Sequence, residues 1–85
     1  SNLKLQDIWS SVLDKIEERV DDSMIFNTFL SDSKLAAIDK DTAIVLVNSS
    51  YAKEFINSSF LFELIQNTIS KVTETNFKLS PNSLI

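Results

Sequence analysis

The side chains with which this chain could carry out chemistry are Asp, Glu, Lys, Ser and Tyr, because its 85 residues include no His, Cys or Gly. Without Cys there is no thiol nucleophile, thiolate zinc site or disulfide, and without His the usual general base and metal ligand are missing. Without Gly, the glycine-rich loops that cradle phosphates cannot form. No remaining pair is spaced to act as nucleophile and base. The sequence therefore predicts no enzyme, no catalytic residue, no cofactor site and no metal site.

Acidic side chains on the first predicted helix form the most regular group of ionisable residues. With Ser11 and Lys15, the acidic residues Asp7, Asp14 and Glu18 lie opposite an apolar stripe at helical spacing. No His or basic cluster accompanies them, so a solvated charged face is the favoured interpretation over a carboxylate site.

The overall charge and the length set further limits. The chain has 12 acidic and 8 basic side chains, a formal net charge of −4. Neutralisation of phosphates supplies most non-specific nucleic-acid affinity, so this charge argues against strong binding of DNA or RNA. A chain of this length can bury one compact core. No apolar stretch approaches the ~20 residues of a membrane span and the start lacks a signal peptide's pattern, so we expect a soluble, cytoplasmic domain.

Two helices are predicted in the first third of the chain. A helix of about four turns over residues 5–20 follows from an apolar stripe, formed by Ile8, Trp9, Val12, Leu13, Ile16 and Val20. Asp21-Asp22-Ser23 favours a turn and an N-cap. A second helix over 23–30 buries Phe26, Phe29 and Leu30, which leaves Met24 and Ile25 without an obvious core role.

A β-hairpin is predicted next. Ile44-Val45-Leu46-Val47 is an unbroken β-favouring run and indicates a buried strand. Residues 34–38 give a weaker strand signal, because Ala has poor β propensity, and a helix stays open there. Asp39-Lys40-Asp41 predicts a tight turn between antiparallel strands.

The last part of the chain is predicted to be a long helix followed by a strand. Helical spacing runs from Tyr51 to Val72, with Asn57-Ser58-Ser59 marking a bend or a new start, so one helix or two remain open. Phe77-Lys78-Leu79 alternates as a short third strand. We therefore expect one α+β domain over residues 1–80, of order α-α-β-β-α-β, with a three-stranded sheet covered by helices on one face. Residues 81–85 are expected to begin a linker or tail.

Three groups of anchor residues follow one another along the chain. They are Ile8-Trp9 with Leu13, Ile16 and Val20; then Phe26-Asn27-Thr28-Phe29-Leu30; then Asn48, Tyr51, Glu54-Phe55-Ile56, Phe60 and Leu64-Ile65. From about Leu5 to Leu79, their order and spacing resemble the N-terminal domain (domain I) of the bacterial chromosomal replication initiator DnaA. Phe29 stands where the family often has Trp, Asn48-Ser49 where it commonly has Pro-Asn, and Tyr51 where it usually has Phe.

The resemblance implies a K-homology-like fold that does no chemistry and works through protein contacts in DNA replication initiation. Such domains self-associate as weak homo-oligomers, contact the replicative DNA helicase during helicase loading and receive replication regulatory proteins. The ATPase of such an initiator would lie in downstream domains outside this chain.

Four residues are the candidates for partner binding. The resemblance implies helicase contact at Tyr51 and self-association at Trp9, with packing of each ring as the alternative. Met24 and Ile25 would form an outward apolar pair, with surface residues of no role as the alternative; at the matching place the family can carry a charged contact residue.

A K-homology-like domain that binds single-stranded nucleic acid is the alternative function. Those modules clamp the nucleic-acid backbone with a Gly-x-x-Gly loop. This chain has no Gly, and Lys53 and Lys71 are isolated in the sequence, so we expect weak nucleic-acid binding at most. A helix lying on a membrane surface is disfavoured, because the polar faces are acidic.

Overall fold

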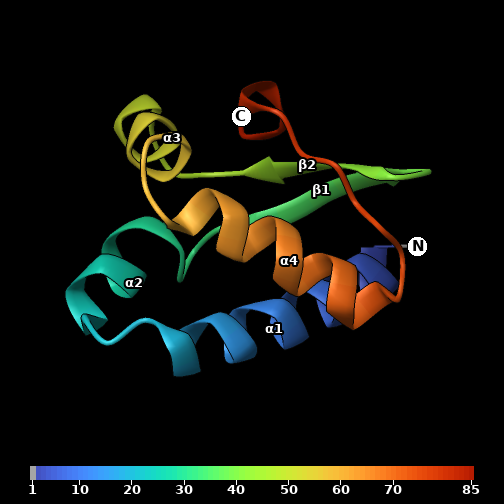
Figure 1. Ribbon diagram of the computed structural model, residues 1–85, viewed down its shortest axis with the longest axis horizontal. Coiled ribbons are helices and arrows are strands. Elements are labelled where there is room, and N and C mark those ends of the chain that lie inside the picture. Colours follow the sequence, from blue (N-terminus) through green and yellow to red (C-terminus); the bar gives the residue numbers. More distant parts are fainter. Residues whose placement is uncertain (1) are drawn as a thin grey trace.

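The computed structural model describes residues 2–85, with side chains from Lys4 onward (Figure 1). Its elements, in chain order, are α1 (Asn2–Arg19), α2 (Ser23–Phe29), β1 (Lys34–Asp39), β2 (Thr42–Leu46), α3 (Ser50–Asn57), α4 (Leu61–Thr73) and the 3-10 helix η1 (Pro81–Ser83). The predicted α+β class and the α-α-β-β-α order are confirmed. The long helical segment is two helices, α3 and α4, because Ser58 and Ser59 turn their hydroxyls back onto the last carbonyls of α3.

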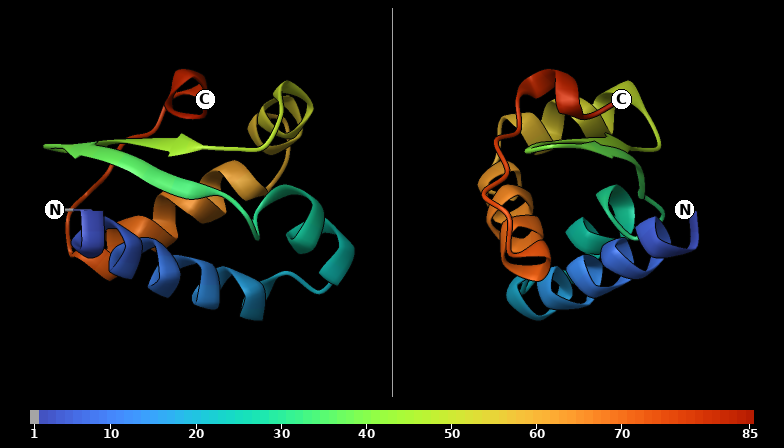
Figure 2. Two further views of the ribbon diagram at one scale, coloured as in Figure 1. Left: turned by 180° about the vertical axis from the view of Figure 1, so that it is seen from behind. Right: turned by 90° about the vertical axis from the view of Figure 1, so that its right-hand side faces the viewer.

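The core is built from α1 and α4, which run antiparallel beneath the β-hairpin (Figures 1 and 2). The stripe predicted on α1 is buried at Trp9, Val12, Ile16 and Val20. On α4 the buried side chains are Leu61, Ile65, Thr68 and Ile69. Burying a Leu, Ile or Val side chain stabilises the fold by about 1.5–3 kcal/mol, so these two stripes are a main source of stability.

The hairpin pairs β1 and β2 as antiparallel strands, from Lys34 opposite Leu46 to Asp39 opposite Thr42. Its turn is made by Lys40, whose φ of 58° lies in the left-handed region. The register shifts between Leu35 and Ala37, so one extra residue is accommodated in β1.

The predicted three-stranded, K-homology-like sheet is wrong: the sheet formed by residues 2–85 has two strands. Phe77 to Leu79 is extended but does not pair with a strand. Its backbone N–H groups donate instead to the Ser70 hydroxyl, the Asp41 carbonyl and the Gln66 side-chain oxygen. The alternating pattern arises because Phe77 is buried in the core while Lys78 is exposed, and an extended loop produces the same alternation as a strand.

Residues 81–85, which were expected to begin a linker, pack against the free edge of β2. Leu84 is buried and forms a parallel bridge with Val45. The Ile85 N–H donates to the Val45 carbonyl at 2.9 Å, and the Val47 N–H donates to the Ile85 carbonyl at 2.8 Å. The end of the described chain therefore covers a strand edge that would otherwise have unpaired backbone groups.

Candidate protein-interaction surface

A row of three aromatic rings joins α2 to α3. The rings of Phe29 and Phe55 are stacked, with centroids 4.2 Å apart and planes at 12°. Tyr51 extends the row on the outside. Its ring centroid lies 5.7 Å from that of Phe29, and the two ring planes are tilted by 52°. Phe29 is buried, whereas Tyr51 is 68% exposed. The ring of Tyr51 thus has one face supported by the core and the remainder open to a partner.

The start of α3 is fixed by polar contacts that hold Tyr51 in place. The Ser49 hydroxyl accepts a hydrogen bond from the Ala52 N–H at 3.0 Å and caps the helix. The Asn48 amide donates to the Thr28 carbonyl at 3.0 Å and lies 3.3 Å from an Asp32 oxygen. Asn48 therefore ties the start of α3 to the end of α2.

The neighbouring residues Met24 and Ile25 differ in exposure. Met24 is 75% exposed at the start of α2, which is capped by the Asp22 carboxylate accepting from the Met24 N–H at 2.9 Å. Ile25 is half-buried and packs against the core. Helices α2 and α3 pack together at one end of the molecule (Figure 1). Met24 belongs to α2 and Tyr51 to α3. Of the two residues expected to face outward, only Met24 is exposed.

Trp9 is a core residue and does not have the partly exposed ring that the self-association interpretation requires. Only 3% of its surface is exposed, and its indole Nε1 donates to the Ser33 hydroxyl at 3.0 Å. The ring lines a groove of about 420 Å³ between α1 and the hairpin, together with the apolar side chains of Leu5, Leu13, Leu35 and Leu46. Because so little of the indole is exposed, the surrounding side chains would supply most of any contact made by this face.

Three further apolar residues, which the sequence does not single out, are exposed outside these positions. Leu46 is 46% exposed although it belongs to the run predicted as a buried strand, because in a two-stranded sheet alternate side chains face away from the core. Phe60, at the start of α4, is 57% exposed, and Ile85 is 55% exposed. The period-two pattern of β2 would have identified Leu46, but no sequence signal separates Phe60 from a packing residue.

None of the helices within residues 2–85 combines the length and the apolar character needed to cross a membrane.

The fold and the surface define a small α+β domain that displays aromatic and apolar side chains at the junction of two short helices. The sequence model of the DnaA N-terminal domain matches residues 6–71, and the chain belongs to this family. It is therefore a domain of a DNA replication initiator, and the family is one of interaction domains rather than catalytic domains. The match includes all four residues singled out in the sequence, Trp9, Met24, Ile25 and Tyr51.

Proposed function

We propose that the end of the domain formed by α2 and α3 binds the replicative DNA helicase and regulatory proteins during replication initiation in the cytoplasm. The observation that carries this proposal is the 68% exposed ring of Tyr51, which rests on the buried Phe29. An exposed aromatic ring held in one orientation loses little conformational entropy on binding, and such residues dominate protein interfaces. Met24, with a flexible apolar side chain, would add adaptable contact area on the neighbouring helix.

The test is a titration of the replicative helicase with the domain and its Tyr51 variants. Tyr51→Ala is expected to weaken binding by about 1–2 kcal/mol, roughly five- to thirtyfold. Tyr51→Phe is the matched control, because it keeps the ring and its contact with Phe29, and should bind within about threefold of the unmodified domain. If Tyr51→Ala bound the helicase as tightly as the unmodified domain, Tyr51 would not be a helicase contact.

We also propose that weak self-association uses the groove above Trp9. Leu46 offers an exposed apolar side chain at this groove, and Leu5 and Leu13 extend the apolar surface along α1. A second copy that covered these side chains would remove apolar area from water, which stabilises association by about 25 cal/mol per Å² before the costs of binding.

Sedimentation of two matched variants tests this second surface. Leu46→Lys places a charge in the groove and should shift the domain toward monomer. Ile85→Lys adds the same charge at a similarly exposed apolar residue that does not line the groove, and should leave the oligomeric state unchanged. Equal behaviour of the two variants would exclude the groove as the self-association surface.

A further inference from the structure

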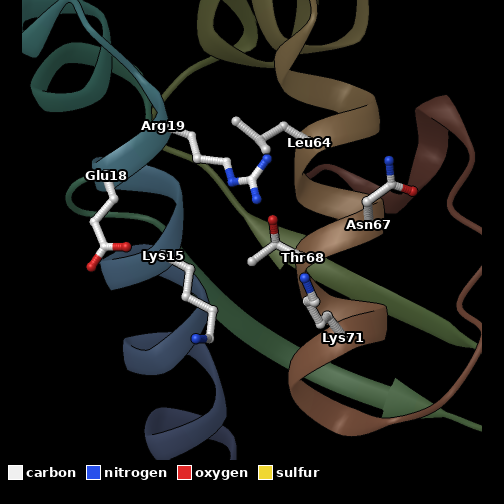
Figure 3. Close-up of a pocket in the computed structure, with 7 residues that line it drawn as sticks. All are labelled: Lys15, Glu18, Arg19, Leu64, Asn67, Thr68 and Lys71. Atoms are coloured by element: carbon white, nitrogen blue, oxygen red, sulfur yellow. The ribbon is translucent and has the colours of Figure 1, made fainter.

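A second groove, of about 460 Å³, lies between α1 and α4 on the side of the helices that faces away from the hairpin core (Figure 3). Its walls are Lys15, Glu18 and Arg19 of α1 and Leu64, Asn67, Thr68 and Lys71 of α4. No lining residue belongs to α2 or α3, so this groove is separate from the surface around Tyr51.

The charge of this groove is opposite to that of the chain. Three of the eight basic residues, Lys15, Arg19 and Lys71, line it, although the net charge is −4. Figure 3 shows the Arg19 guanidinium reaching across toward α4 and the Glu18 carboxylate directed away from it. Within residues 2–85, none of the three cations makes an ion pair or a hydrogen bond through its side chain. Like charges that face one another across a groove repel, and an anion between them would relieve that repulsion.

The floor of the groove carries a hydroxyl that opens onto the groove and makes no hydrogen bond within the described residues. Thr68 is 8% exposed, and its hydroxyl points toward the Arg19 guanidinium in Figure 3. Among the described residues this hydroxyl has no hydrogen-bond partner, whereas the Thr73 hydroxyl on the same helix donates to the Ile69 carbonyl at 2.7 Å. A hydroxyl and a guanidinium that converge on one point can both donate to a carboxylate.

Helix electrostatics explain only part of this arrangement. Arg19 and Lys71 lie in the last turns of α1 and α4, where cations interact favourably with the helix dipole. That effect accounts for each charge on its own helix. It does not account for Lys15, which lies a full turn earlier, or for the Thr68 hydroxyl.

We propose that this groove binds the carboxylate side chains of an acidic segment on a partner protein, as a second docking site that goes beyond the proposed function. Arg19 and Thr68 would hold a carboxylate, Lys15 and Lys71 would supply attraction, and Leu64 would contact the apolar stem of the bound side chain. A polynucleotide is disfavoured, because the groove is short, no aromatic side chain lines it for base stacking, and the net charge of −4 repels an extended polyanion.

The experiment is an NMR titration of the whole chain at physiological salt with a capped hexapeptide of Asp, Glu and Leu. A peptide with Asn and Gln in place of the acids is the ligand control, and a short oligothymidylate is the competing ligand. Arg19→Gln/Lys71→Gln removes two charges from the groove. Lys40→Gln/Lys78→Gln removes two charges outside both grooves and is the matched protein control. Thr68→Val removes the hydroxyl at nearly constant volume.

We expect saturable shifts confined to Lys15–Arg19 and Leu64–Lys71. Binding should weaken about tenfold in Arg19→Gln/Lys71→Gln and about threefold in Thr68→Val, with less than a twofold change in Lys40→Gln/Lys78→Gln. Three outcomes would overturn the proposal: no saturable binding, equal weakening by both double variants, or tighter binding of the oligothymidylate in the groove. None of these bears on the Tyr51 surface, which the helicase titration tests separately.

Discussion

The indole Nε1 of Trp9 donates a hydrogen bond to the hydroxyl of Ser33 across 3.0 Å, and that hydroxyl in turn donates to the Leu30 carbonyl. Trp9 is in α1, while Ser33 directly precedes β1. Both side chains are buried, so this short chain of hydrogen bonds connects the first helix to the hairpin through the core.

Removing the Trp9 ring should destabilise the domain directly. Trp9→Ala is expected to lower the free energy of unfolding by about 3–5 kcal/mol, the usual cost of truncating a buried aromatic ring. Urea denaturation measures this change. A variant that unfolded at the same urea concentration as the unmodified domain would contradict the buried position of the indole.

The hydrogen bond between Trp9 and Ser33 can be isolated by a double-mutant cycle. Ser33→Ala alone leaves a buried N–H without a partner and should cost about 1–3 kcal/mol. In a Trp9→Phe background, where that N–H is absent, Ser33→Ala should cost less. Equal costs in the two backgrounds would mean that the two side chains are not coupled.

Removing the Asn48 contact between α2 and α3 should weaken helicase binding without a large loss of stability. Asn48→Ala removes the contact with the Thr28 carbonyl and should cost about 0.5–1.5 kcal/mol of stability, since the residue is exposed. It should also weaken helicase binding, because the start of α3 positions Tyr51. Asn76→Ala, an exposed Asn after α4, is the control and should leave both measurements unchanged.

The segment after α4 should contribute to stability. Leu84→Ala removes a fully buried side chain and is expected to cost about 2–5 kcal/mol. Hydrogen exchange provides a second measurement, because the Val47 N–H donates to the Ile85 carbonyl. Deleting Leu84 and Ile85 should therefore speed exchange at Val47 more than at the amides that pair β1 with β2, which change only through the loss of global stability.

Because the chain has no Gly, its left-handed backbone positions are occupied by other residues, Lys40 and Glu74. Glu74 ends α4 with a φ of 56°. Glu74→Gly should therefore raise stability by up to about 1 kcal/mol, because Gly adopts this conformation without steric cost. Glu63→Gly, the same substitution on the exposed face of α4, should lower stability by about 1 kcal/mol. Thermal denaturation compares the two variants, and a loss of stability in Glu74→Gly would contradict the assignment.

The sequence determined the elements whose signals are local. Apolar side chains at helical spacing located α1 and α4, Asp22 and Ser49 marked the starts of α2 and α3, and Asp39-Lys40-Asp41 located the hairpin turn. These predictions succeeded because capping and periodicity depend on neighbours within a few residues. The lack of His, Cys and Gly narrowed the function classes, and the order of aromatic anchors identified the family.

Tertiary structure decided which residues are buried and which residues from different helices line the same groove. An extended segment such as 77–79 shows the same alternation whether it pairs with a strand or with side chains of α4, so its sequence could not reveal which partner takes its N–H groups. Exposure of a ring depends on what packs over it, so Trp9 is buried and Tyr51 is exposed although both lie on apolar stripes. Lys71 stands alone in the sequence, and only the antiparallel packing of α1 on α4 brings it to the same groove as Lys15 and Arg19.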